Sequence, residues 1–560
     1  MEDLETAEPS KTQHKVEKKS RAFKLAFISL CACSFISTLD TVIIAAALPA
    51  IAKALDATSN QAYWNGTGFL FAQAAFQPVY GALSEIFGRK YCLLVALTIF
   101  TIASVLCAAA QDIFWLIGAR VFQGLGAGGI NALCTIIIAD MVALRERSKY
   151  VGFLGLVSSV ALISGYILGA SISERSTWRL VFYINLPVCI PTIVGLLKFL
   201  HLQATPLTLK ENLLRADWIG MVILTSSLIS LLFGVTSGGV LYSWSSANVL
   251  SALIAGGVGV IIFALHESFT AKYPMMPPRM FANRTSVSAY FSSFVLGLTL
   301  WAMEYYLILY FLVTQQKSLL GSAVAILPGT SFVPVFAAAS GFIMAYTKRF
   351  KILNSTSLVL MSLGFGLTSL LRPDSSKAVQ FGFQVLYGIG GGMLFPGRQV
   401  AIQASQADED VPMASALSSF TVSLGEAFGV AIGGSIFQNV WRHKVARCIS
   451  DGLIPTEYFL TDHEAEQAVN LIKEFPEPVR VIYRRITSEG INVIFIVLAI
   501  FAAVATLGSF ISRDISLDKD SGSSQKFVEE KAEKTEKTQK TELVTSVETS
   551  TISGKESIVR

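Results

Sequence analysis

Apolar stretches long enough to cross a membrane alternate with short polar stretches along most of the chain. A helix needs about 20 mainly apolar residues to span the hydrocarbon core of a bilayer. Fourteen stretches approach or exceed this length, so the pattern predicts an all-α polytopic membrane protein with fourteen spans. The predicted spans are residues 23–51, 63–83, 91–110, 113–138, 151–172, 180–200, 218–237, 249–266, 287–313, 322–346, 353–371, 379–402, 414–437 and 491–511.

A weak internal repeat divides these spans into two sets of six. Gly341 and Arg349 stand eight residues apart, as do Gly81 and Arg89, and each pair follows the second span of its set. We therefore predict an N-terminal six-helix bundle at residues 23–200, a linker with two extra spans at 201–286, and a C-terminal six-helix bundle at 287–512. The polar segments complete the plan: cytoplasmic tails predicted to be disordered at 1–22 and 513–560, and a long extracytoplasmic loop at 439–490, whose residues 462–488 favour an amphipathic surface helix.

Basic residues distinguish the two sets of alternate loops. One set is rich in Lys and Arg, and the short loops of the other carry fewer, which predicts an even number of spans with both chain ends in the cytoplasm. The loop at residues 403–412 is acidic although the count places it inside, and it is the weakest point of this topology. The basic set contains Arg89/Lys90, Arg145/Arg147/Lys149, Lys210/Arg215, Lys272/Arg279/Arg284 and Lys348/Arg349/Lys351.

Composition agrees with a membrane protein and excludes several functions. The 560 residues are 52% hydrophobic and 15% charged, whereas a soluble chain carries about a quarter charged residues. The net charge of +5 is spread over loops, so nucleic acid is not an expected partner. The seven cysteines form no CxxC or Cys/His cluster, so we expect neither disulfides nor a metal. No phosphate loop, HExxH or nucleophile elbow is present, so we expect no enzyme, no ATP-driven pump and no cofactor.

The segment between the second and third spans concentrates small and charged residues. Gly81 and Gly88 allow two helix ends to approach closely, and Glu85 is placed to pair with Arg89 or Lys90. Charges in hydrocarbon cost several kcal/mol each, so this loop should lie at the membrane surface, on the cytoplasmic side. An ordinary hairpin whose charges set the topology is the simpler alternative.

Two ionisable residues lie inside predicted spans of the N-terminal half. Asp40 is more than two helical turns from either end of the first span, where an ionised carboxylate is expensive, so we expect it to take up a proton near neutral pH. Ser37 and Thr41 flank it, and a structural Asp held by those hydroxyls is the alternative. Arg120 shares one helical face with Gln123 and should point into a protein or water-filled interior, unless it snorkels to the outer boundary.

Several of these segments resemble motifs of one transporter family. The loop Gly81–Lys90 resembles the G-x-L-[AS]-[DE]-x-x-G-R-[KR] signature of major facilitator transporters, and Trp178–Pro187 is similar to W-R-x-x-F-x-I-N-x-P. The run Leu39–Pro49 resembles the first-span motif L-D-x-T-[IV]-[IV]-x-x-A-L-P of fourteen-span drug:proton antiporters. The resemblance extends from the first to the thirteenth span. It is closest to the fungal-type branch of these antiporters. It implies two parallel six-helix halves, with the two extra helices between them.

The resemblance also implies roles for individual residues. Arg120, Gln123 and Gly124 match a fourth-span motif associated with proton coupling. The loop Gly81–Lys90 would latch the cytoplasmic face. The fifth-span mark of exporters, G-P followed by G-G, is altered here to Gly165-Tyr166 and Gly169-Ala170, which leaves the direction of transport open. The remaining candidate gating residue is Asp140, in a charge cluster that is either solvated or braces Arg89 and Lys90.

The C-terminal half carries further charges inside predicted spans. Glu304 stands among Trp301, Tyr305 and Tyr306 and could bind cationic or planar substrates, or pair structurally with a neighbouring helix. Arg398 and Glu426 are costly unless they face a central cavity, although they could simply pair with each other. We predict a substrate cavity formed by Gln123, Trp301, Tyr305 and Arg398, and proton coupling through Asp40, Arg120, Glu304 and Glu426.

These features predict a proton-coupled exporter of amphipathic small molecules such as drugs, toxins or secondary metabolites. Its partners would be the substrate, protons and the lipid bilayer, and we expect it to act as a monomer. It would lie in the plasma membrane, with the vacuolar membrane as an alternative. Two other functions remain open: an importer of siderophores or amino acids by symport, and a transporter-like nutrient sensor that signals through its tails.

Overall fold

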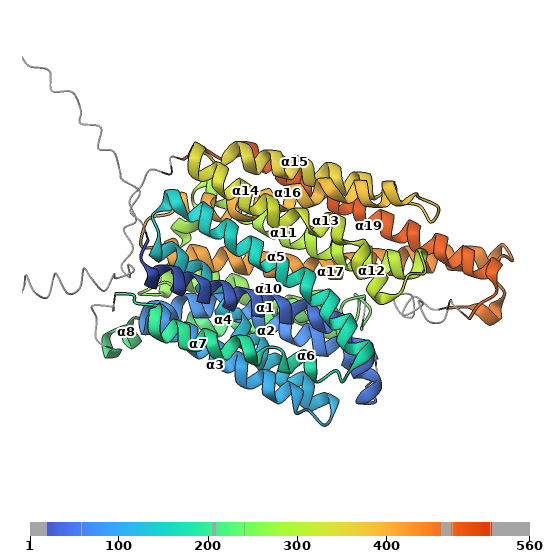
Figure 1. The fold of residues 1–560 in the computed structure, drawn as a ribbon, viewed down its shortest axis with the longest axis horizontal. Coiled ribbons are helices and arrows are strands. Elements are labelled where there is room, and N and C mark those ends of the chain that lie inside the picture. The colour runs from blue at the N-terminus through green and yellow to red at the C-terminus, as the bar shows by residue number, and fades with distance from the viewer. Residues whose placement is uncertain are drawn as a thin grey trace, which may run out of the picture.

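The computed structural model describes residues 19–57, 59–203, 209–239, 241–460, 472, 474–515 and 517. In this part of the chain the backbone is helical apart from short connections, and it contains no named strand (Figure 1). The predicted tails fall almost entirely outside the described residues, as does most of the first half of the predicted amphipathic helix at 462–488.

Seven helices form the N-terminal half of the described chain. The sixth predicted span is interrupted at residues 184–185, directly before Pro187, which lacks the N–H that a continuous helix would use. Gly88 separates the second and third helices with φ +88°, a backbone conformation that favours glycine. The helices are α1 (Arg21–Ala54), α2 (Ser59–Phe87), α3 (Arg89–Ala108), α4 (Ile113–Met141), α5 (Leu144–Arg175), α6 (Leu180–Tyr183) and α7 (Leu186–Phe199).

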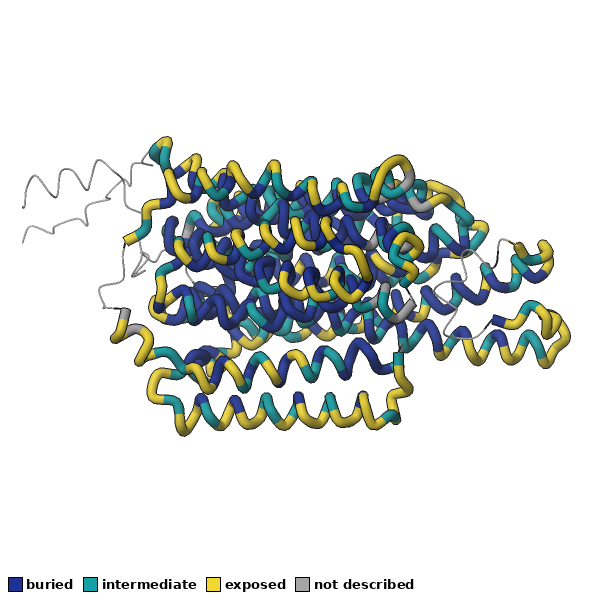
Figure 2. Tube along the Cα trace, turned by 90° about the horizontal axis from the view of Figure 1, so that it is seen from below, coloured by how far each residue is buried: buried dark blue, intermediate teal, exposed yellow. Residues whose placement is uncertain are grey.

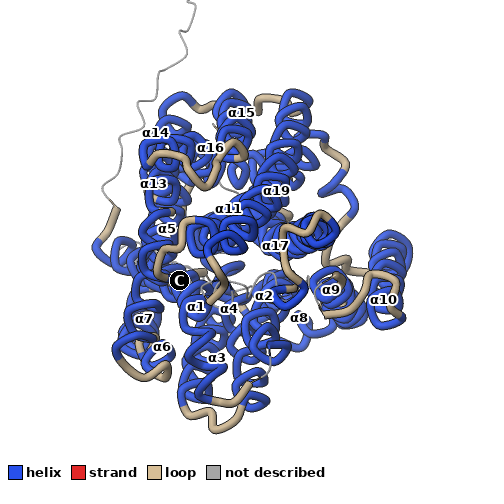
Figure 3. The backbone as a smooth tube through the Cα atoms, turned by 90° about the vertical axis from the view of Figure 1, so that its right-hand side faces the viewer, coloured by secondary structure: helices blue, strands red, loops and turns tan. Residues whose placement is uncertain are grey.

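The linker contributes a helical pair at one side of the molecule. Helix α9 packs on α2 of the N-terminal half and α17 of the C-terminal half, and α10 packs mainly on α9 (Figure 3). The ring of Phe233 in α9 stacks on that of Trp64 in α2 with centroids 5.6 Å apart. The linker elements are α8 (Leu209–Arg215), α9 (Trp218–Ser237), α10 (Ala247–Leu265), the π-helix η1 (His266–Thr270) and the 3-10 helix η2 (Pro278–Phe281).

The C-terminal half contains the longest helix. At about 1.5 Å per residue, the 40 residues of α17 exceed the thickness of a bilayer core, and α17 and α19 project beyond the other helices (Figure 1). The predicted loop at 439–490 is therefore largely helical at both of its ends. The elements are α11 (Arg284–Leu309), η3 (Tyr310–Thr314), α12 (Leu319–Ala325), α13 (Leu327–Thr330), α14 (Phe332–Thr347), α15 (Lys351–Thr368), α16 (Lys377–Ala404), α17 (Val411–Ser450), η4 (Thr456–Tyr458) and α19 (Glu477–Ile511).

Twelve segments of the described chain are helical, long enough and apolar enough to cross a membrane. The other two predicted spans coincide with α2 and α15, which are helical but are not among the twelve. Helix α2 carries Asn65, Gln73 and Gln77 toward the interior, and these polar residues lower its hydropathy. The all-α membrane fold is thus confirmed, and the count of fourteen spans stays a prediction.

The hydrophobic core joins the two halves at one end of the molecule. Buried residues such as Ile137 and Leu144 of the N-terminal half share one cluster with Met344 and Met413 of the C-terminal half. Two further clusters each lie within one half, one around Ile51 and Trp178 in the N-terminal half, the other formed by buried residues of the C-terminal half. A small fourth cluster, which includes Phe71 and Ala427, joins the halves beside α9. Buried positions gather along the middle of the molecule, and exposed ones lie on its outer helices and ends (Figure 2). The halves are therefore sealed together at the end that carries the Gly81–Lys90 loop.

The acidic loop that weakened the predicted topology has a basic partner at the same end. Arg279 pairs with Glu409 at 2.7 Å and with Asp410 at 2.8 Å. The hydrogen bond from Arg279 to Asp410 raises the pKa of the guanidinium. These ion pairs offset the charge of the 403–412 loop, which explains how an acidic loop can share an end with basic ones.

Candidate functional site

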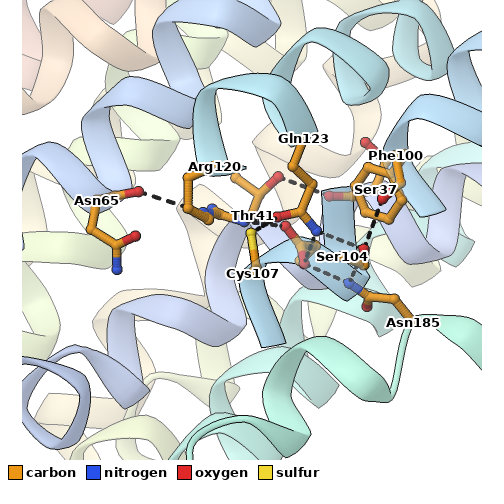
Figure 4. Close-up of polar contacts among 10 residues, drawn as sticks. Ser37, Thr41, Asn65, Phe100, Ser104, Cys107, Arg120, Gln123 and Asn185 are labelled. Atoms are coloured by element: carbon orange, nitrogen blue, oxygen red, sulfur yellow. Dashed lines mark hydrogen bonds and ion pairs between the residues drawn. The ribbon is translucent and has the colours of Figure 1, made fainter. Parts of the chain in front are cut away.

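A buried ion pair lies inside the N-terminal half. Arg120 of α4 donates through Nη1 to Oδ2 of Asp40 in α1 at 2.5 Å, and the two residues are 1% and 0% exposed. Arg120 Nη1 also donates to Oε1 of Gln123, one turn along α4, at 2.7 Å (Figure 4). The guanidinium therefore points into the protein interior, and the snorkelling alternative is wrong.

Two amides, one from α4 and one from the break between α6 and α7, complete the shell around the Asp40 carboxylate. Its Oδ1 accepts from Nε2 of Gln123 at 2.9 Å and from Nδ2 of Asn185 at 2.7 Å. Both amides also donate to Ser104 Oγ of α3, at 2.9 and 3.2 Å (Figure 4). Three donors, from Arg120, Gln123 and Asn185, therefore converge on one carboxylate. The flanking hydroxyls do not provide this: Thr41 donates to the backbone of Ser37 instead.

Glycines of α4 allow the neighbouring helices to pack closely around the Asp40–Arg120 pair. A Cβ on Gly124 would lie 2.2 Å from the carbonyl oxygen of Phe69 in α2, and one on Gly126 would lie 2.7 Å from that of Ala96 in α3. The absence of these side chains lets α2 and α3 approach α4 from two sides. The ring of Phe69 is thereby placed 4.1 Å from the guanidinium carbon of Arg120, within range of a cation–π contact.

A cavity of about 210 Å³ lies between the two halves. Its wall combines apolar side chains with amides and hydroxyls, and it includes three ionisable residues of the C-terminal half: Glu304, Arg398 and Glu426. Other lining residues are Ser34, Thr38, Gln73, Gln77, Asn131, Thr135, Ser158, Leu300, Trp301, Thr330, Phe395, Gln399, Ser419 and Ser423.

The ionisable residues of the cavity do not form direct ion pairs with each other. No salt bridge within 4.0 Å joins Arg398 to a carboxylate of the described chain, so the expected alternative of an Arg398–Glu426 pair is wrong. Arg398 Nη1 donates instead to Ser418 Oγ at 2.9 Å and Ser293 Oγ at 3.3 Å. Glu304 is 5% exposed, and its Oε2 has no hydrogen-bond partner.

Two residues that we predicted in the cavity lie elsewhere. Gln123 belongs to the Asp40 shell, because α4 turns that face toward α1 and α3. Tyr305 is 41% exposed and stacks edge-on against Tyr306, whereas Trp301, one turn earlier on α11, lines the cavity. The two residues are four positions apart and so differ by only about 40° around α11, which is why the sequence alone did not separate them.

The Gly81–Lys90 loop predicted from the sequence is helical except at Gly88, because α2 continues to Phe87 and α3 begins at Arg89. This segment, still called the Gly81–Lys90 loop below, is held by α4 and packs against α17. Arg89 Nε donates to Asp140 Oδ2 at 3.1 Å in a buried pair, and its Nη2 lies 3.8 Å from Glu85. Lys90 donates to the carbonyl of Leu197. Asp140 therefore braces Arg89, which is one of the two predicted alternatives. This buried ion pair joins α3 to α4 at the sealed end.

Residues of the altered fifth-span motif contact both halves of the protein. A Cβ on Gly165 would lie 2.4 Å from a methyl of Val42, so α5 contacts α1 there, and Gly169 is also buried. Tyr166, in place of the motif Pro, packs against the core of the C-terminal half. The helix is continuous through this region, where Pro would have removed a hydrogen bond.

Sequence reasoning missed several polar residues of the site. Asn185 and Ser104 bind the Asp40 shell, and Gln73, Gln77 and Gln399 line the cavity. Asn185 stood inside a quoted motif, and an amide within an apolar span is a signal that could have found it. Among the described residues, no group of three His, Cys, Asp or Glu side chains is arranged to hold a metal.

Two helical bundles around a cavity of mixed apolar and polar lining, with buried charges in each bundle, define a secondary membrane transporter. A family model described as Major Facilitator Superfamily matches residues 30–429. The chain therefore belongs to the major facilitator superfamily, and it is a transporter rather than an enzyme.

Fungal relatives span nearly the whole chain. The chain is 33% identical over 509 residues to "MFS transporter L2" of Phoma sp., covering 90% of this chain and 85% of that protein. It is 32% identical over 529 residues to "Efflux pump FUS6" of Gibberella moniliformis, covering 93% of each. Among solved structures, the proton:xylose symporter XylE shares the fold with a TM-score of 0.54 at 14% identity, covering 90% of this chain and 98% of that one.

Proposed function

We propose that this protein exports amphipathic small molecules, of the secondary-metabolite or toxin kind, in exchange for protons. The observation that carries the proposal is the cavity between the halves, which mixes apolar walls with amides, hydroxyls and uncompensated charges. Such a wall suits a molecule with an apolar body and a polar group. Fungal relatives that are named efflux pumps support the outward direction.

In the proposed mechanism, substrate occupies the cavity while the halves open to one side at a time. The structure is closed at the end with the Gly81–Lys90 loop, which we assign to the cytoplasm. Protonation of Asp40 would remove the charge that holds Arg120, and so change the packing of α1 against α4. Glu304 and Glu426, which line the cavity, are the second candidates for the proton.

A gradient provides the driving force in this account. A proton moving down 100 mV releases about 2.3 kcal/mol, and each pH unit adds about 1.4 kcal/mol. We place the protein in the plasma membrane, with the vacuolar membrane as the alternative, where an acidic far side supplies such a gradient. We further propose that it works as a monomer and has the fourteen spans of the drug:proton antiporter branch.

The test has two stages. A deletion strain should retain a metabolite or become sensitive to a drug, which identifies the substrate. Inside-out vesicles carrying the protein should then accumulate that substrate when the lumen is acidic, because protons leaving the lumen would drive it in. Accumulation on the side opposite to this expectation would support import, the alternative that Tyr166 leaves open.

A further inference from the structure

Arg398 is a buried cation with neutral partners. It is 5% exposed, and one of its terminal nitrogens donates to the hydroxyls of Ser293 and Ser418. Its Nε is buried without a hydrogen-bond partner. Within the described chain no carboxylate lies within 4.0 Å of it, although Glu426, the ionisable group of α17 that acts on it electrostatically, also lines the cavity.

This arrangement is energetically costly. A buried charge without a direct counterion has lost its hydration without a charged partner to replace it. Nε and the adjacent Nη2 form one edge of the planar guanidinium, the edge that binds a carboxylate with two parallel hydrogen bonds. The Ser293 and Ser418 hydroxyls engage Nη1, and the structure gives Nη2 no partner among the described residues, so that edge is free of protein acceptors.

The rest of the cavity provides complementary surroundings. Phe395 lies one turn before Arg398 on α16, with its ring centroid 5.2 Å from the guanidinium carbon. Trp301 of α11 supplies a second aromatic surface to the cavity, and Glu304, one turn further, presents an unpartnered carboxylate oxygen. A molecule with an anionic group, an aromatic or aliphatic body and a nearby hydrogen-bond donor would satisfy all three.

We propose that Arg398 is the recognition site for an anionic head group, a carboxylate or an enolate, so that the substrates are amphipathic weak acids. This inference rests on the proposed function, because it assigns the substrate class of the same cavity. The anion binds the Nε–Nη2 edge of Arg398, and its apolar body lies against Trp301 and Phe395. Glu426, which also lines the cavity, is an alternative, internal counterion.

Equilibrium binding to the purified protein in nanodiscs tests the inference. Three probes share one ring system and differ in charge: naphthalene-1-acetate, naphthalene-1-acetamide and 2-(1-naphthyl)ethylamine. A charge-assisted hydrogen bond contributes about 1.5–3 kcal/mol, so the acetate should bind about tenfold to a hundredfold more tightly than the amide. Tighter binding of the amine than of the acetate would overturn the inference.

Substitutions test whether the preference for the acetate over the amide depends on Arg398. Arg398→Gln should bind the amide as the wild type does and lose its preference for the acetate, while Arg398→Lys should keep part of it. Arg349 is an exposed arginine in the loop before α15, and Arg349→Gln is the matched control. This variant should bind the acetate and the amide as the wild type does. An unchanged preference in Arg398→Gln, or equal loss of acetate and amide binding in a folded variant, would contradict the inference. Because binding needs no gradient, a failure of proton-driven export would leave this result standing, and the two proposals can fail separately.

Discussion

Asp40 and Arg120, 80 residues apart in the sequence, meet through a 2.5 Å contact between Oδ2 and Nη1 at the centre of the N-terminal half. The contact joins α1 to α4, and the amides of Gln123 and Asn185 extend it to a carboxylate with three donors. The pair lies outside the residues that line the cavity. A change of charge at Asp40 would therefore act on the substrate through helix packing rather than through contact.

Replacing one residue of the Asp40–Arg120 pair should destabilise the protein more than replacing both. Asp40→Asn or Arg120→Gln alone leaves one buried charge without its partner, at a cost of about 3–5 kcal/mol. The double variant Asp40→Asn/Arg120→Gln keeps the amide network and should regain most of that stability. Thermal unfolding in detergent measures the difference. Equal loss in the single and double variants would mean that the pair contributes packing rather than charge compensation.

The sealed end should open during transport. A Cβ on Gly81 would lie 2.8 Å from that of Ala416 across the two halves. The Cβ atoms of a disulfide are about 3.5–4.5 Å apart, so a shift of the two segments by about 1 Å should let Gly81→Cys and Ala416→Cys, in a background without the seven native cysteines, form a disulfide in the closed state. The oxidised protein should stop transporting, and a reductant should restore transport. Full activity of the cross-linked protein would show that this end does not open.

Gly124 should be more sensitive to substitution than Gly118 on the same helix. A methyl at Gly124 would meet the Phe69 carbonyl at 2.2 Å, whereas nothing lies within 4 Å of one at Gly118. Gly124→Ala should lower stability by about 1–3 kcal/mol through overpacking. Gly118→Ala should leave stability unchanged or raise it, by up to about 1 kcal/mol, because alanine favours a helix. Similar melting temperatures for the two variants would contradict the close approach of α2 to α4.

Trp301 and Tyr305 give a matched test of the cavity. Trp301 lines it and Tyr305, one turn away, is 41% exposed, so Trp301→Ala should impair rescue of a drug-sensitive deletion strain and Tyr305→Ala should not. Membrane levels of both variants should match the wild type. A larger defect in Tyr305→Ala would move the binding surface to the outer face of α11.

Sequence patterns predicted the helices well, because a span is a local property of about 20 apolar residues. They placed Asp40, Arg120 and Glu304 in the interior for the same reason, since a charge in a span must avoid lipid. They did not orient Gln123 and Tyr305, whose helical faces depend on neighbouring helices. The extension of α17 beyond its predicted end also went unseen, because a polar helix outside the bilayer has no apolar run.

The motif resemblance predicted the contacts of the Gly81–Lys90 loop better than the contacts of the cavity residues. Arg89, Glu85 and Asp140 lie together as the signature and the charge cluster suggested. The hydroxyl partners of Arg398 come from two other helices, and no spacing in the sequence connects Ser293 or Ser418 with it. Contacts between helices of this kind require the fold.

Proton movement driven by substrate is the most direct test of the central claim that ionisable groups inside the protein couple export to protons. Inside-out vesicles loaded with a pH-sensitive dye should show an alkaline shift of the lumen when the identified substrate is added outside. The reason is that protons leave the lumen in exchange for each substrate molecule that enters. The shift should be absent in Asp40→Asn/Arg120→Gln. Substrate entry into wild-type vesicles without any change of lumen pH would contradict the account.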